Sequence, residues 1–276
     1  MARLEEDSPQ ELSPMLDKVL SDKPVFVAPP EYEPVKELPS GFKWYSKGTS
    51  FYIRPLKGKE AKILAEKAEN SLKSPQEFER VLNSIMKDNV ILTNMNYDDL
   101  ILKDRFYLVI LIITITYSNK NFQLKWNCSE CQTANGHHLE MDSIFISDVK
   151  EDLDSKEIQK LVDGTNFIYH PVTIKKRREA IELVEESDEY DVQYLDIVKN
   201  LSLLNTKSSL KDLYHEFEDE VSIQDQVMVD SFIDENSFGV IPNVPTECTQ
   251  CGGKTLLGLT FRGGLFIQHY VKPSKS

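Results

Sequence analysis

The stretches Cys128-Ser129-Glu130-Cys131 and Cys248-Thr249-Gln250-Cys251 have the same cysteine spacing, and the chain is organised around them. They contain all four cysteines of the 276-residue chain, and 116 residues separate them. A C-x-x-C pair forms a tight turn that directs both sulfurs toward one ion, and two such turns complete the tetrahedral four-thiolate shell that structural zinc prefers. We therefore expect Cys128, Cys131, Cys248 and Cys251 to bind one Zn²⁺. Four protein ligands leave no position for a reactive water, so the site is expected to be structural.

The residues that flank the two pairs predict strands. Phe122, Leu124 and Trp126 alternate with polar residues before the first pair, and Gly252-Gly253 followed by residues 255–261 leads out of the second. A strand before one turn and a strand after the other are typical of a zinc ribbon. We expect residues 122–140 and 245–262 to form it, so that the metal joins the middle of the chain to its end.

Other interpretations of the cysteines remain open. Disulfides require an oxidising compartment, and the sequence has no recognisable signal peptide. A thioredoxin-like redox site requires one C-x-x-C in a βαβ unit. Buried free thiols are a further alternative. His137 and His138 could replace a sulfur, although they are expected to be surface residues near a strand end because four cysteines suffice.

Composition limits the possible functions. The chain has 32 basic and 45 acidic side chains, a net charge of −13, which argues against a nucleic-acid-binding role that rests on clustered Lys and Arg. A hydrophobic content of 40% is enough for a core. The most apolar run, residues 106–115, is shorter than the ~20 residues of a membrane span. A soluble protein made in the cytoplasm is expected.

The first half of the chain predicts strands followed by helices. Residues 42–45 and 51–53 suggest a β-hairpin after the turn at 38–41. A helical face begins near Ala61, and Ser74-Pro75-Gln76-Glu77 is a capping box that predicts the start of another helix. Residues 104–115 could be a strand or a buried helix, and their length favours the helix.

The second half predicts a hairpin around Asp163-Gly164, helices after Thr173 and along 192–201, and a helix capped by Ser222.

The predicted fold class is therefore α+β, with an N-terminal β-hairpin and helical layer, a small central sheet, C-terminal helices and the zinc ribbon. We expect five segments: an acidic, proline-containing arm, disordered or partner-bound (1–37), the hairpin and helical layer (38–121), the first ribbon half with the sheet (122–172), a helical segment (173–244), and the second ribbon half with the C-terminal tail (245–276).

No catalytic motif supports an enzyme. The chain has no phosphate-binding or dinucleotide-binding glycine pattern, no H-E-x-x-H and no G-x-S-x-G. Pairs of acidic residues are frequent, but 45 carboxylates produce such pairs by composition alone. We assign no catalytic residue and no cofactor besides the zinc.

The order of these features resembles the baseplate hub protein family of T4-type contractile-tailed bacteriophages. The residues that carry the resemblance are Leu38-Pro39-Ser40-Gly41, Ile53-Arg54-Pro55-Leu56, the helix start at residues 59–64, Asp98-Asp99-Leu100, the apolar segment 104–115 and the strand into the first C-x-x-C. It is strongest over residues 38–145 and looser over 165–268, and the order of the motifs matters more than any one of them.

The resemblance implies a structural role in the phage tail baseplate, in or near the hub, through contacts with other tail proteins and within the virion. It implies no catalytic residues. Two alternatives stay open at this stage: an assembly chaperone that is absent from the mature virion, and a zinc-ribbon protein associated with nucleic acid. Strong binding to duplex DNA that weakens steeply with salt would favour the second.

Overall fold

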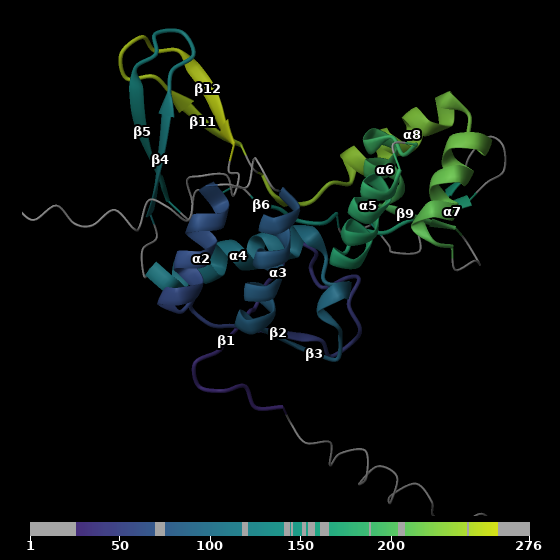
Figure 1. Cartoon of the computed structure of the whole chain (residues 1–276), viewed down its shortest axis with the longest axis horizontal. Helices are drawn as coiled ribbons and strands as arrows, with labels where there is room; N and C mark the ends of the chain where they lie inside the picture. The colour runs from purple at the N-terminus through teal and green to yellow at the C-terminus, as the bar shows by residue number, and fades with distance from the viewer. Residues whose placement is uncertain are drawn as a thin grey trace, which may run out of the picture.

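The computed structural model describes residues 26–69, 75–117, 121–140, 144, 146–150, 153, 158–160, 166–187, 189–203, 208–241 and 243–258. Helices and small antiparallel sheets confirm the predicted α+β class. Figure 1 shows three parts: a helical body, a second group of helices beside it, and a narrow ribbon of two hairpins that projects from the body.

The body combines a three-stranded antiparallel sheet with three helices. The strands β1 (Glu33–Pro34), β2 (Ser50–Ile53) and β3 (Val90–Thr93) pair in the order β1-β2-β3. The helices are α2 (Gly58–Glu69), α3 (Pro75–Asn89) and α4 (Leu102–Tyr117). Pro75 occupies the first helical position of α3, as predicted, whereas Ser74 lies outside the described residues.

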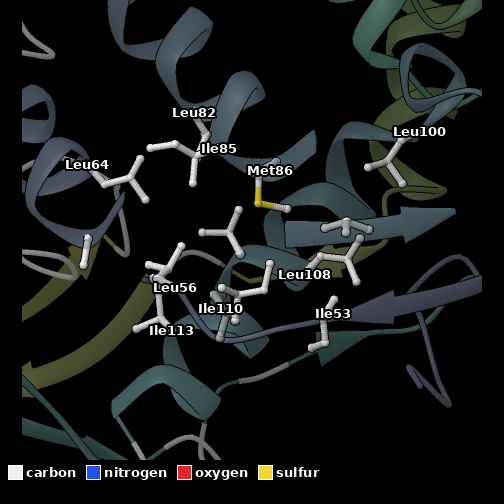
Figure 2. Close-up of a cluster of buried hydrophobic side chains, with 14 of the residues drawn as sticks. Ile53, Leu56, Leu64, Leu82, Ile85, Met86, Leu100, Leu108, Ile110 and Ile113 are labelled. Atoms are coloured by element: carbon white, nitrogen blue, oxygen red, sulfur yellow. The ribbon is translucent and has the colours of Figure 1, made fainter. Parts of the chain in front are cut away.

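The apolar run is the helix α4, which confirms the favoured interpretation. Leu108, Val109, Ile110, Ile112 and Ile113 are all buried, because α4 passes through the middle of the body. Figure 2 shows Leu108, Ile110 and Ile113 facing Leu56, Leu64 and Met86 across the core. Among the described residues, none of the helices combines the length and apolar character that a membrane span requires.

The predicted hairpin between residues 42–45 and 51–53 is wrong in its first strand. Residues 39–45 form turns, and Gly41 and Phe42 adopt φ angles of 58° and 63°, which an extended strand cannot accommodate. The partners of β2 are β1 and β3. The turn is held at the start of α4, where Asp104 accepts hydrogen bonds from the Ser40 N–H (3.1 Å) and the Tyr45 hydroxyl (2.6 Å).

Part of the N-terminal arm packs on the body. Pro34 belongs to β1, the Val35 N–H donates to the Phe51 carbonyl, and the Tyr32 hydroxyl donates to the Asp88 carbonyl. Residues 1–25 lie outside the described residues.

The second group of helices has a hydrophobic core of its own. It contains α5 (Ile174–Glu186), α6 (Val192–Val198), α7 (Leu210–His215), a π-helical turn (Glu216–Glu220) and α8 (Ile223–Glu235). A sheet β7-β8-β9 (Ile158–Lys160, Asn166–Tyr169, Leu201–Leu203) accompanies it. The antiparallel pairing of β7 and β8 confirms the second predicted hairpin, whose turn lies outside the described residues, and Ser222 caps α8 as predicted.

The two cores meet at an aromatic contact and a short backbone ladder. The Trp44 ring stacks on Phe238, with centroids 5.4 Å apart, and meets Tyr169 edge-on. Leu102 N–H donates to the Val172 carbonyl, and Ile174 N–H donates to the Leu100 carbonyl. The strands β6 (Ile146–Ser147) and β10 (Gly239–Val240) pair nearby and lead the chain toward the ribbon.

Candidate metal centre

The ribbon consists of two antiparallel hairpins, each closed by one cysteine pair. β4 (Asn121–Asn127) pairs with β5 (Ala134–Glu140), and β11 (Asn243–Glu247) pairs with β12 (Lys254–Gly258). The last register pairs, Asn127 with Ala134 and Glu247 with Lys254, enclose the two C-x-x-C turns. Figure 1 shows the hairpins side by side at the same end of the molecule, although they come from the middle and the end of the chain.

The two cysteine turns have the same backbone structure. The N–H of Cys128 donates to the Thr133 carbonyl (2.9 Å), and the Gln132 N–H donates to the Cys128 carbonyl (3.0 Å). The second turn repeats both bonds at the same lengths, from Cys248 to Gly253 and from Gly252 to Cys248. Gln132 and Gly252, the residues at the equivalent position, both have a left-handed backbone, with φ angles of 59° and 70°. The sites are therefore two copies of one local structure.

The four sulfurs converge on one point. All four Sγ atoms lie within 4.8 Å of one another, and both the Cys128–Cys251 and the Cys131–Cys248 pairs are 3.6 Å apart. A tetrahedral ion with metal–sulfur bonds of about 2.3 Å places its ligands about 3.8 Å apart. A disulfide requires about 2.05 Å. The cysteines are free thiols, arranged so that they could bind one metal ion.

Burial differs within each pair. Cys128 and Cys248, the first cysteine of each turn, are buried, whereas Cys131 and Cys251 reach the surface. Each sulfur contact thus joins a buried thiol of one turn to an exposed thiol of the other. An ion bound by all four sulfurs would therefore join the two hairpins through one buried and one exposed cysteine of each.

Asn135 joins the two half-sites directly. Its side chain is buried at the start of β5, and its amide nitrogen donates to the Cys248 sulfur (3.4 Å) and to the Thr133 carbonyl (2.8 Å). Its amide oxygen accepts hydrogen bonds from the backbone N–H and the hydroxyl of Thr249 (3.0 and 2.9 Å). Every polar atom of this side chain is used, so Asn135 fixes the orientation of one hairpin against the other. Sequence reasoning missed this residue.

Local hydrogen bonds favour thiolates at two positions. The backbone N–H groups of Cys251 and Gln250, together with Asn135, lower the pKa of Cys248, and hydrogen bonds at Thr133 lower the pKa of Cys131. At Cys251 the backbone N–H of Gly253 lowers the pKa. Contacts with the Cys131 and Cys128 sulfurs raise the pKa by more than this, so the net shift is upward. Thiolates close together repel one another, and a bound divalent metal would compensate two of the four negative charges of a fully deprotonated cluster.

His137 is not part of this cluster. In the part of the chain that the structure describes, the group of possible metal ligands at this site consists of the four cysteines. His137 lies further along β5, opposite Leu124, and His138 lies opposite Gln123.

The comparison with protein families supports the resemblance seen in the sequence. The family model described as T4 bacteriophage base plate protein matches residues 30–260. This range includes the body, the second helical group and both cysteine turns. No curated protein and no solved structure matches the chain. Because the family model covers most of the chain, the protein belongs to the T4 bacteriophage base plate protein family.

Proposed function

We propose that the chain is a structural subunit of the phage tail baseplate, positioned in the hub or the region next to it, and that it remains in the finished virion. The observation that carries this proposal is the family match over residues 30–260, which spans the whole described architecture. The role rests on contacts with other tail proteins. The subunit is made in the host cytoplasm before it joins the tail, and it acts without a catalytic step, a membrane or nucleic acid.

The proposal includes one structural Zn²⁺ bound by Cys128, Cys131, Cys248 and Cys251. The sulfur separations and the repeated turn geometry support a tetrahedral site, and an all-sulfur ligand set suits zinc. The position of the site explains why the ion is needed. An isolated two-stranded hairpin is at best marginally stable in water, and the ribbon is made of two. Structural zinc contributes roughly 10 kcal/mol of apparent folding free energy.

The zinc would also give the ribbon a fixed shape. The whole second helical group lies between the two hairpins in sequence, so the position of one hairpin against the other depends on contacts between them. The Asn135 bridge and the four sulfurs supply those contacts at one end of the ribbon. A subunit with a rigid projection of this kind can present the same surface in every copy of a symmetric assembly.

Quantitative mass spectrometry tests the assembly role. Purified mature particles and infected-cell lysate are analysed together, and the chain is counted against a tail protein of known copy number. A fixed, small ratio to that protein in the particles is expected of a structural subunit. Presence in the lysate with absence from particles would instead show an assembly factor, and would overturn the proposal that the chain stays in the virion.

A further inference from the structure

Helix α8 exposes aliphatic side chains that no part of the described structure covers. Ile223 is 78% exposed and Val227, one helical turn later, is 60% exposed, and Met228 is also exposed beside them. The opposite face of α8 is packed, with Val229 and Gln226 buried. A surface helix normally presents polar residues to solvent. We call Ile223, Val227 and Met228 the α8 strip.

The strip lies in a strongly acidic part of the chain. Residues 212–253 contain ten carboxylates and no lysine or arginine. Asp219 and Glu220 precede the strip at the end of the π-helical turn, and Asp230 follows Val227 by three residues, so that it lies on the same face of the helix. These three side chains are exposed, and none of the ion pairs among the described residues involves them.

This combination selects the kind of partner. Exposed aliphatic residues favour association through burial, whereas the surrounding carboxylates repel any surface of the same sign. A second copy that presented the same face would bring two acidic rims together. Nucleic acid and anionic membranes would be repelled for the same reason. A protein surface with an apolar strip flanked by lysines or arginines satisfies both requirements.

We infer that the α8 strip and its acidic rim form a docking surface for another tail protein that presents an apolar groove bordered by basic residues. This inference rests on the proposed baseplate role. The ribbon and the helix α8 lie in different parts of the molecule in Figure 1, so the metal centre and the docking surface can be perturbed separately.

The experiment uses the full chain during phage assembly. The photo-crosslinking residue p-benzoylphenylalanine replaces Ile223 in a copy supplied to infected host cells whose phage lacks its own functional copy. The crosslinked protein is identified by mass spectrometry, purified, and titrated against the zinc-loaded chain at several salt concentrations. A double variant, Ile223→Ser with Val227→Ser, removes the apolar contact, and Asp219→Asn with Glu220→Gln and Asp230→Asn removes the charges.

We expect the serine variant to weaken binding by about tenfold or more, because few buried residues carry most of the energy of an interface. The charge variant should bind with much less salt dependence than the wild type. Leu256→Ser is the matched control, since Leu256 is a 65% exposed aliphatic residue on the ribbon, and it should leave the affinity unchanged. Unchanged thermal unfolding and zinc content show that the variants remain folded.

Three outcomes would overturn the docking surface: no crosslink to a tail protein from position 223, a crosslink to a second copy of the chain, or an affinity that the serine variant does not change. These differ from failure of the baseplate role itself. In that case the chain would be absent from tails and tail intermediates, whichever residue occupies position 223.

Discussion

The amide nitrogen of Asn135 lies 3.4 Å from the sulfur of Cys248, a residue 113 positions further along the chain and in the other hairpin of the ribbon. The same side chain accepts two hydrogen bonds from Thr249. A neutral amide is well suited to this place, because it gives one hydrogen bond to a sulfur that becomes negative and accepts two from the backbone and side chain beside it. Groups that orient metal ligands in this way tune the affinity of the metal.

Replacing Asn135→Asp should therefore weaken metal binding. Aspartate keeps the oxygen that accepts from Thr249 but places a carboxylate beside the Cys248 thiolate, where the amide now donates. We expect zinc affinity to fall by roughly tenfold to a hundredfold, which is the usual effect of losing an outer-shell partner. Competition with a chromogenic chelator measures it. The control is Asn127→Asp, which adds the same charge at an exposed site on the same hairpin. Equal affinities for both variants would contradict a positioning role for Asn135.

The variant Cys251→Ser should lose the bound metal. One of the four sulfurs is removed, and serine is a poor zinc ligand, so most of the roughly 10 kcal/mol that structural zinc contributes should be lost. We expect no zinc by elemental analysis and a sharply lower unfolding temperature. Ser129→Ala alters an exposed residue in the other cysteine turn and should change neither quantity. A Cys251→Ser protein that kept both its zinc and its unfolding temperature would rule out the four-cysteine site.

The metal ligands could be predicted from the sequence because their chemistry is local. Spacing alone defines a C-x-x-C turn, and two turns with no cysteine left over define the set of ligands. The starts of helices have the same local character, as Pro75 at the first position of α3 and the Ser222 cap of α8 show. The predicted helical segment 173–244 includes α7, but the prediction does not place its start, although Ser209 and Asp212 form a capping box there.

Features that depend on distant residues could not be predicted. The partner of β2 is β3, which follows α3 directly, without any turn residue that would indicate a strand pair. The first strand expected from residues 42–45 fails because Phe42 adopts a left-handed conformation, which is rare for a bulky side chain. Asn135 is an ordinary polar residue in a strand until the second hairpin is placed beside it.

The left-handed residue of each cysteine turn provides a matched pair of variants. Gly252→Ala forces a Cβ into a conformation with a φ of 70°, and it should destabilise the ribbon by about 1 kcal/mol. Gln132→Gly at the equivalent position removes such strain, which offsets the greater freedom of glycine in the unfolded chain, so no loss is expected. Unfolding is followed by the fluorescence of Trp126 in a Trp44→Phe background, since the chain has two tryptophans. Equal losses from both variants would show that backbone strain is not the cause.

Asp104 should give the body a measurable pH dependence. Burial raises the pKa of its carboxyl group, although hydrogen bonds from Ser40 and Tyr45 lower it, and the net shift is upward. The folded state therefore binds the proton more tightly than the unfolded state, whose aspartate has a pKa of about 3.9. The contribution of Asp104 to stability is fully present below the unfolded pKa and is lost as the pH rises through the folded pKa.

The variant Asp104→Asn isolates this effect, because asparagine does not titrate and can still accept from the Ser40 N–H. The difference in unfolding free energy, variant minus wild type, should increase as the pH is raised from the unfolded pKa through the folded one and then become constant. Metal release at acid pH affects both proteins alike and cancels in the difference. Denaturant unfolding at a series of pH values measures it, with the exposed carboxyl change Asp99→Asn as the control. A difference in unfolding free energy that stays constant, or that decreases with rising pH, would show that the pKa of Asp104 is not raised in the folded state.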